Sequence, residues 1–390
     1  MSVKNISSAI LGVGVDDTTI DLFESQYPVP TGVSYNSYVI LDEKVAILDT
    51  VDNRATDAWL ANLTEALGDR MPEYLVVSHM EPDHGANIAK LAALYPEMQV
   101  VGNAKTFVYM EQFFGPDAVA KERRVVVKDG ESLSLGSHTL TFVFAPMVHW
   151  PEVMVSYESS EKVLFSADGL GKFGALDVED PEGWACEARR YYFGIVGKFG
   201  AQVQALLKKA AAVDIQTVCP LHGPVLTGKE LAEALRLYDI WSRYDVESEG
   251  VMIAYASVYG NTEKAAQLLA EKLKEQGCPK VVLTCVQRED WAEAVEDAFR
   301  YGKLVLAAPT YNGFLFPAMR EFIEHLTERN YQNRQVAFIE NGSWAPAAAK
   351  EMKKLLEGCK NVTLGSTVTI RSAMTEETPA QLDALAQELR

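Results

Sequence analysis

The strict alternation of apolar runs and helical patterns after Gly250 limits the possible folds more than any other feature of the sequence. The apolar runs VMIAYAS, KVVLTCV, KLVLAAP and QVAFIE are each followed by a helical pattern, and a further strand and helix come after them. Strands that are apolar throughout are covered on both faces, which is typical of parallel βαβ units. We therefore expect a five-stranded, doubly wound parallel sheet whose ligand lies beyond the carboxyl ends of the strands.

The part of the chain before Gly250 predicts a separate α/β domain. The segment YNSYVILDEKVAILD predicts a hairpin that turns at Asp42-Glu43-Lys44. Strands are also predicted at 74–78, 99–102, 124–128, 139–144, 153–157 and 162–166, and helices at 55–67, 85–95 and 228–244. Such a mixture indicates an α/β sandwich. The acidic, turn-prone segment 245–250 marks a boundary, so we expect two domains, 1–248 and 249–390.

Charge and cysteine content argue against several classes of partner and location. The formal net charge of -18 opposes binding to nucleic acids and anionic membranes, because both require clustered lysine and arginine. No basic leader and no apolar run of membrane-spanning length is found. The cysteines are scattered and form no CxxC pair, which indicates reduced thiols in a cytoplasmic protein. They are Cys186, Cys219, Cys278, Cys285 and Cys359.

A dense group of potential metal ligands follows the predicted strand 74–78. His79, Glu81, Asp83 and His84 lie close together, directly before Gly85 and a predicted helix. Neighbouring carboxylates repel each other, and their burial is unfavourable unless a cation offsets the charge. The segment therefore predicts a metal site. A solvated polar turn is the alternative for this segment taken alone.

Three later residues strengthen the metal hypothesis, because His149, Asp168 and His222 each end an apolar, strand-like run. Side chains at the ends of neighbouring strands meet on one rim of a domain. Any single histidine of this kind has a structural role more often than a catalytic one, but four of the six histidines fall in this pattern. The other two, His138 in a turn and His325 on a predicted helix, are expected to be ordinary surface or helix residues.

The order HxExDH, followed by His, Asp and His at strand ends, resembles the metallo-β-lactamase-like domain of the A-type flavodiiron proteins. Hydrolytic relatives carry HxHxDH and bind zinc, whereas Glu81 replaces the second histidine here. Four histidines and three carboxylates form a hard, anionic set that suits iron better than zinc. The resemblance implies an N-terminal αββα sandwich that holds two irons. It assigns His79, Glu81 and His149 to one iron, Asp83, His84 and His222 to the other, and Asp168 to a bridge between them.

Residues beyond these ligands are weaker candidates, and no further catalytic residue is expected. Tyr191 or Tyr192 could offer a proton near the irons, but packing in the core is an equally good interpretation. Gly85 stands where relatives often have serine, which removes no ligand.

Three predicted strand ends in the second domain carry loops that suit a flavin. The turn after VMIAYA offers hydroxyl groups and backbone N–H groups at a helix start, which can bind a phosphate, although an ordinary capped turn is the alternative. Glycines in the other two loops let the backbone approach a flat ring, and Tyr311 or Trp344 could cover its face. This half resembles flavodoxin, which implies FMN. The predicted contacts are Ser257, Val258, Tyr259, Gly260, Asn261, Thr262, Pro309, Thr310, Tyr311, Asn312, Gly313, Gly342, Ser343 and Trp344.

The resemblance implies reduction of O2 to water, of NO to N2O, or of both, with electrons passing through FMN. The family usually takes its electrons from rubredoxin. Since no CxxC pairs follow the flavodoxin-like segment, we expect a separate donor protein. The family also implies a head-to-tail homodimer or a dimer of dimers. The ligand set does not fix which gas is preferred, because both gases use the same ligands.

Two other functions remain open at this point. One is a zinc hydrolase of the metallo-β-lactamase superfamily fused to a flavodoxin-like domain, against which Glu81 argues. The other is a non-enzymatic flavin electron carrier, against which the complete set of ligands argues.

Overall fold

The structure is a computed structural model that describes residues 3–390. Its contacts group the chain into two compact units. One contains the chain up to Tyr192 together with Ala201–Tyr238, and the other contains Phe193–Gly200 together with Asp239–Arg390. The proposed domain division at 248/249 stays a prediction. No helix among the described residues is both long and apolar enough to cross a membrane.

Two β-sheets build the first unit. One has the strand order β1-β2-β7-β8-β9-β10-β11 and the other β12-β13-β14-β15-β16-β17. The strands of the first sheet are β1 (Lys4–Asn5), β2 (Ile10–Gly12), β7 (Tyr38–Ile40), β8 (Val45–Leu48), β9 (Pro72–Val76), β10 (Gln99–Gly102) and β11 (Arg124–Val126). Those of the second are β12 (Ser132–Ser134), β13 (Thr139–Phe144), β14 (Met154–Glu158), β15 (Val163–Phe165), β16 (Thr217–Cys219) and β17 (Leu226–Thr227). Two short ribbons pair β3 (Val15–Asp17) with β6 (Val33–Tyr35), and β4 (Leu22–Phe23) with β5 (Tyr27–Pro28).

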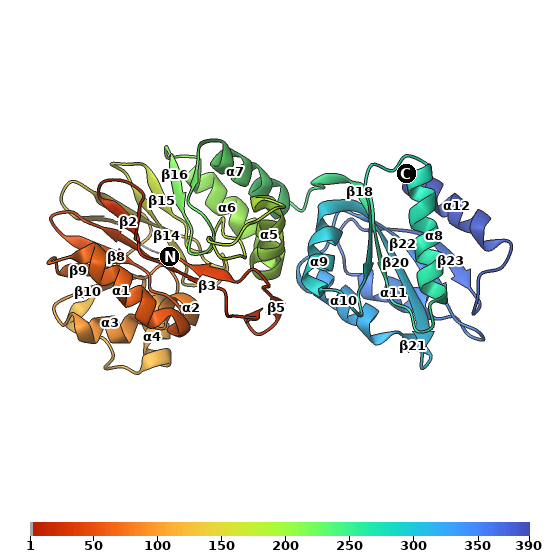
Figure 1. Ribbon diagram of the computed structural model, residues 1–390, viewed down its shortest axis with the longest axis horizontal. Helices are drawn as coiled ribbons and strands as arrows, with labels where there is room; N and C mark the ends of the chain where they lie inside the picture. The colour runs from red at the N-terminus through yellow and green to blue at the C-terminus, as the bar shows by residue number, and fades with distance from the viewer. Residues whose placement is uncertain (1–2) are drawn as a thin grey trace. The chain divides into compact units, whose positions relative to one another are not determined.

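The core of this unit lies between the two sheets. Alternate side chains point inward, so that Leu48 and Val76 of the first sheet and Phe142, Met154 and Phe165 of the second belong to one buried cluster. Helices α1 (Thr56–Leu67), α3 (Ile88–Leu94) and α4 (Ala104–Phe114) lie beside the first sheet (Figure 1). Helices α6 (Gly200–Ala210) and α7 (Gly228–Ser242) lie beside the second. This is the predicted αββα sandwich.

Most of the predicted elements of this unit are confirmed, within a few residues at their ends. The hairpin is present, with Ile40 paired to Ala46 in antiparallel strands β7 and β8. The predicted helix 85–95 is two helices, because α2 (Pro82–Gly85) starts earlier at Pro82 and α3 starts anew after Asn87. Proline is well tolerated in the first turn of a helix, where its missing N–H has no partner to lose. Helices α4, α5 (Trp184–Tyr191) and α6 are not predicted.

The expectation that His138 is a surface residue is wrong. Its backbone directly follows the bend at Gly136-Ser137, but its ring is buried between two carboxylates. The Nδ1 atom is 2.7 Å from Asp42 Oδ2, and Nε2 is 3.2 Å from Glu161 Oε1. Ser137 Oγ also donates to Asp42. These contacts tie the turn of the first-sheet hairpin to the bend between β12 and β13. The other remaining histidine, His325, lies on a helix as predicted and stacks on Trp291.

We expect this contact to stabilise the fold in a window of mildly acidic pH. Burial alone would lower the pKa of His138, but hydrogen bonding to Asp42 and Glu161 raises it. Burial alone would raise the pKa of Asp42, but its hydrogen bonds to His138 lower it. The histidine contribution is complete below the unfolded pKa of about 6.5 and is lost as the pH rises through the raised pKa. The aspartate contribution is complete above about pH 4 and is lost at lower pH.

Urea unfolding of the wild type and of His138→Gln between pH 4 and 9 measures this effect. The wild type should be more stable by about 1 kcal/mol near pH 5 to 6, allowing for solvent screening. The difference should shrink at alkaline pH. An advantage that grows above pH 8 would contradict the assignment.

The second unit contains one parallel sheet of strand order β19-β18-β20-β22-β23. Its strands are β18 (Ser248–Tyr255), β19 (Val281–Cys285), β20 (Tyr301–Tyr311), β22 (Gln335–Asn341) and β23 (Thr363–Ile370), and the short β21 (Phe314–Leu315) pairs with β20. Its helices are α8 (Asn261–Glu275), α9 (Trp291–Arg300), α10 (Pro317–Glu328), α11 (Ala348–Leu356) and α12 (Thr378–Leu389). The five-stranded doubly wound sheet is confirmed. Because the chain order reverses between β18 and β20, a crevice forms beyond the carboxyl ends of these strands.

Candidate metal centre and flavin site

The seven predicted ligands lie at strand ends, in strand connections or on the short helix α2 of the first unit, and the fold brings their side chains together. His79 follows β9, Asp168 follows β15, His222 follows β16, His149 lies between β13 and β14, Glu81 precedes α2, and Asp83 and His84 lie on α2. The residues form two groups, and within each group the candidate ligand atoms lie within 4.8 Å of one another. One group is His79, Glu81, His149 and Asp168, and the other is Asp83, His84 and His222. The sequence expectation that strand ends converge is therefore met.

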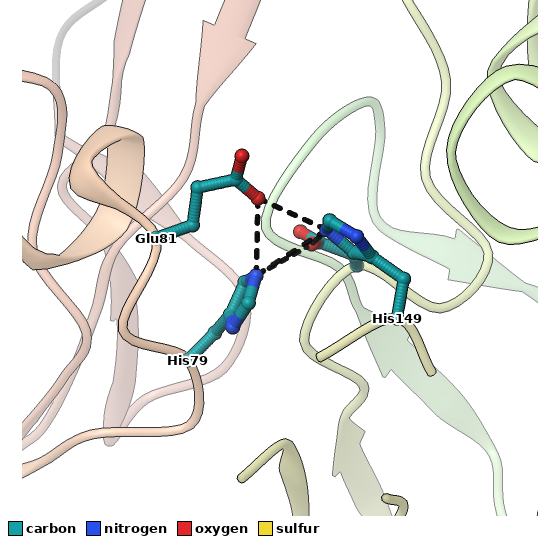
Figure 2. Close-up of side chains that lie close together, drawn as sticks. His79, Glu81 and His149 are labelled. Atoms are coloured by element: carbon teal, nitrogen blue, oxygen red, sulfur yellow. Dashed lines mark hydrogen bonds and ion pairs between the residues drawn. The ribbon is translucent and has the colours of Figure 1, made fainter. Parts of the chain in front are cut away.

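We call the seven candidate ligands the cage. Its first half is made by His79, Glu81 and His149 (Figure 2). The Glu81 carboxylate points at both rings, with Oε2 3.2 Å from His79 Nε2 and 3.0 Å from His149 Nε2. The two Nε2 atoms are 3.3 Å apart. Three potential ligand atoms thus surround one point.

The second half is made by Asp83, His84 and His222. Asp83 Oδ2 lies 3.3 Å from His84 Nε2 and 3.1 Å from His222 Nε2, and these two nitrogens are 3.0 Å apart. The arrangement repeats that of the first half with one carboxylate and two imidazoles.

Asp168 lies between the two halves and directs one oxygen to each. Its Oδ2 is 3.1 Å from His149 Nε2 and 3.4 Å from His79 Nε2. Its Oδ1 is 3.2 Å from His84 Nε2 and 3.8 Å from His222 Nε2. A carboxylate placed in this way can bridge two cations.

The distances within the cage fit coordination of metal ions. Ligand bonds of about 2.1 Å put neighbouring ligand atoms of a tetrahedral or octahedral ion about 3.0 to 3.4 Å apart. Contacts of 3.0 and 3.3 Å between imidazole Nε2 atoms fall in this range. Asp83 Oδ1 is also buried without a hydrogen-bond partner in the described structure. These residues therefore fit a pair of cations.

The charges of the cage also call for cations. His79, His84, Asp168 and His222 are almost fully buried. Burial and repulsion by Glu81 and Asp168 raise the pKa of Asp83 to about 7. Against the effect of burial, Asp168 and Glu81 raise the pKa of His149 to about 9. Without metal, the carboxylates favour positive charge on the rings of His79 and His149, and metal ions can take over that role.

Two carboxylates outside the ligand set orient the loop that carries the HxExDH motif. Glu152 Oε1 lies 2.8 Å from His79 Nδ1 and accepts the N–H of Met80 at 2.9 Å. Asp49 Oδ1 accepts the N–H of Ser78 at 2.7 Å. An acceptor on Nδ1 fixes the proton there and leaves Nε2 free to bind a metal. On the other side of the cage, the Nδ1 atom of His222 lies 2.7 Å from the carbonyl oxygen of Ser34.

Aromatic rings line the cage and separate the two tyrosine candidates. Phe23 and Tyr191 pack against His222 with ring centroids 5.4 and 5.5 Å away, and Tyr35 lies at 6.0 Å. Tyr192 instead packs against Tyr238 at 5.0 Å. Of the two candidates, Tyr191 is the one seen to pack against His222.

The sequence interpretation misses several of these contacts. Glu152, Asp49 and Phe23 belong to segments without a metal motif, so only the fold reveals their proximity. A partial signal exists for Glu152, since it comes three positions after His149 in the same loop. Glu24 is also missed. Desolvation and the neighbouring Glu81 carboxylate raise its pKa to about 7.

The second unit has a cavity of about 570 Å³ at the carboxyl ends of its strands. Its wall contains every predicted flavin contact except Gly260, and Asn341, Ala345 and Ser372 in addition. Two hydrogen bonds connect the loops around it, because Thr310 Oγ1 accepts the N–H of Ala347 at 2.9 Å and Ser343 Oγ lies 2.7 Å from Ser372 Oγ. The size is that of a small-molecule site. Ser372, which follows β23, could have been predicted from the rule that ligands lie beyond strand ends.

The turn before α8 is shaped for a phosphate. Gly260 adopts φ +85° at the helix start, and its N–H donates to Ser257 Oγ at 3.1 Å. Residues with a side chain rarely take this conformation. The following backbone N–H groups at the start of α8 form a site for an anion. Tyr259 and Trp344, at 91% and 89% exposure, are open to a planar ring or to solvent rather than packed in the core.

We expect Gly260→Ala to weaken FMN binding through this turn. Gly277, at the other end of α8, has a matching φ of +84° and open space around it, so Gly277→Ala introduces similar strain away from the cavity. Each substitution should cost about 1 kcal/mol of stability. Only Gly260→Ala should raise the dissociation constant for FMN, measured by quenching of flavin fluorescence. Equal effects of both variants would show that the turn is not a flavin contact.

Comparison with known proteins agrees with the architecture of both units. Residues 33–223 match the family described as ODP family beta lactamase, and residues 252–384 match a flavodoxin domain. The rubredoxin-oxygen oxidoreductase of Megalodesulfovibrio gigas is 27% identical over 97% of this chain and 94% of its own. The nitric oxide reductase of Moorella thermoacetica is 27% identical over 91% of this chain and 90% of its own. Both alignments therefore run through the lactamase-like and the flavodoxin segments of this chain, in that order. The chain belongs to the flavodiiron protein family.

The crystal structure of the flavodiiron protein from Giardia intestinalis has the same fold. It superposes with a TM-score of 0.91 at 24% identity, over 100% of this chain and 96% of the other. The cofactors of the present chain are FMN and two iron ions, in agreement with its flavodoxin domain and its cage of histidines and carboxylates. The assignment of individual residues to iron and to FMN remains our proposal.

Proposed function

We propose that this flavodiiron protein reduces O2 to water, NO to N2O, or both, at two irons held by the seven-residue cage. The observation that carries the proposal is the position of Asp168, whose two oxygens face the two halves of the cage. In this arrangement the seven residues would hold the irons as a pair, which would supply a centre for the reduction of O2 or NO. The names of the two relatives support both gases, one as an oxygen oxidoreductase and the other as a nitric oxide reductase.

The residues of the chain hold the reaction site in place. When bound, the iron pair supplies a centre for reducing the gas, and FMN supplies the electrons. Glu152 keeps the proton of His79 on Nδ1, so that Nε2 is directed into the cage. The rings of Phe23, Tyr35 and Tyr191 form an apolar wall beside His222, which excludes water from that side.

We further propose rubredoxin as the electron donor and the cytoplasm as the location. The name of the Megalodesulfovibrio gigas relative supports the donor. No disulfide joins any of the five cysteines in the described part of the chain, which suits a reducing compartment. The rate at which reduced rubredoxin reduces the flavin tests the donor, and an FMN that stays oxidised in its presence would exclude it.

We also propose a head-to-tail homodimer, alone or paired as a dimer of dimers, in which FMN of one copy serves the irons of another. Mixing two inactive variants tests this arrangement. Asp168→Ala lacks the metal bridge, and a variant with two disrupted flavin loops lacks FMN. Mixed dimers should regain gas consumption, whereas mixtures that stay inactive in spite of subunit exchange would contradict the arrangement.

Metal analysis combined with rapid kinetics tests the proposed activity. Protein purified without oxygen should contain about two irons per chain. After full reduction it should oxidise rapidly when mixed with O2 and with NO in parallel stopped-flow experiments, and the two rates decide which gas is preferred. Stoichiometric zinc with esterase or lactamase activity would favour a hydrolase instead. Reversible flavin reduction without gas consumption would favour an electron carrier.

A further inference from the structure

An apolar cavity lies between helices α6 and α7 and the face of the second sheet that they cover. Figure 1 shows these helices beside strands β14, β15 and β16. The cavity has a volume of about 40 Å³ and an apolar wall. At its inner end it is lined by Val148, Gly169 and Leu170. This is room for one or two small molecules.

The polar groups at this inner end are paired with each other. Ser166 Oγ donates to the carbonyl oxygen of Gly169 at 2.6 Å, and Tyr238 Oη accepts the N–H of Leu170 at 2.8 Å. A buried water needs two or more polar partners, and apolar cavities without them stay dry and take up xenon or other apolar molecules. The cavity therefore suits an uncharged, apolar occupant rather than water.

A second cavity continues the first toward the surface. It has a volume of about 240 Å³ and shares the side chains of Val155, Leu164, Leu206 and Ala210 with the inner cavity. At its outer end lies Val213, which is 42% exposed. The two cavities thus adjoin each other along α6, one near the surface and one beside the loops at the strand ends.

The inner cavity adjoins the metal cage. Val148 directly precedes His149, and Gly169 directly follows Asp168, so two proposed ligands are sequence neighbours of the cavity wall. We propose that the two cavities together form an entry route and holding site for a small uncharged gas, which crosses the layer of Val148 and Leu170 to reach the cage. O2 and NO have this chemistry. The identity of the gas rests on the proposed function, whereas the presence of an apolar gas site does not.

Xenon binding tests the site independently of the metal and of turnover. Xenon under pressure should appear between Val148 and Leu170 in crystals of the wild type, with or without iron. Ala210→Phe fills the junction of the two cavities and should abolish this density. Ala205, on the same helix, is exposed and lies outside the cavity wall, so Ala205→Phe should leave it unchanged. Absence of xenon from the wild type would overturn the proposal.

Gas kinetics test the route. The second-order rate constant for oxidation of the reduced protein by O2 or NO should fall severalfold in Ala210→Phe and stay unchanged in Ala205→Phe. Flavin reduction by the donor should be the same in both. Equal rates with gas would overturn the route even if xenon binds. If the protein consumes neither gas, the proposed function fails, but the xenon result still stands.

Leu206→Ala provides a second variant in case Ala210→Phe does not fold. It widens the shared part of both cavities. We expect xenon occupancy to rise and the rate constant with gas to be maintained or increased. A loss of either would contradict an entry path along α6.

Discussion

Replacement of Asp168 by alanine should abolish reduction of both O2 and NO while leaving the FMN absorption spectrum unchanged. The substitution removes a side chain whose two oxygens face the two halves of the cage, at 3.1 Å from His149 and 3.2 Å from His84. The two groups would then have no common ligand, and the buried histidines would lose a neighbouring negative charge. Iron content, the absorption of bound flavin, and gas consumption with an artificial reductant measure the effect. Retained turnover would refute the bridging assignment.

Asp42→Ala is a matched control for this experiment. It also removes a partly buried carboxylate of the first unit that bonds to a histidine, but it lies at the hairpin turn, in contact with His138. We expect it to lower the free energy of unfolding and to leave iron content and gas consumption unchanged. If Asp42→Ala were equally inactive, the loss in Asp168→Ala would reflect general destabilisation.

The second large effect is expected for Glu152→Ala. Glu152 is a positioning residue, because it acts on the cage through His79 Nδ1 and the N–H of Met80. Both groups are buried, and without an acceptor they lose a hydrogen bond in the interior. The His79 ring could then rotate or protonate at Nε2. We expect iron affinity and turnover to fall about 10- to 100-fold, the range found when such partners of metal-binding histidines are removed.

Glu152→Gln separates orientation from charge. The amide oxygen can still accept both N–H groups, so iron affinity should recover to within a few-fold of the wild type if orientation is the role. A competition titration with a chelator measures this affinity. If the glutamine variant is as weak as the alanine variant, the negative charge of Glu152 rather than its hydrogen bonding supports the metal.

Much of the candidate metal site follows from local sequence, because ligands that come directly after apolar strands are placed by the strands themselves. His79, His149, Asp168 and His222 were predicted in this way, and the structure brings all of them together. The partners that orient them could not be predicted. Glu152 reaches His79 from a different strand connection, and Ser34, which lies 188 residues before His222, accepts its Nδ1 contact.

The flavin site was more predictable, because a parallel doubly wound sheet places all its carboxyl ends on one edge. Three of the contact loops were recognised from their glycines and hydroxyl groups. The loop at Ser372 has neither an aromatic residue nor a glycine, and its place beside Ser343 depends on the pairing of β22 with β23. The helix prediction for 85–95 was wrong at its start for a local reason, the ability of Pro82 to begin a helix.

The sequence by itself determined the two-part α/β architecture and the candidate residues of the cage and of the flavin loops, because period, strand ends and ligand spacing are properties of neighbouring residues. Only the tertiary structure decided which oxygen of Asp168 faces which histidine, which tyrosine lies near His222, and that His138 is buried between carboxylates. It also revealed the apolar cavity behind the cage. These features depend on distances between segments far apart in the chain, and those distances are fixed by how the sheets and helices pack.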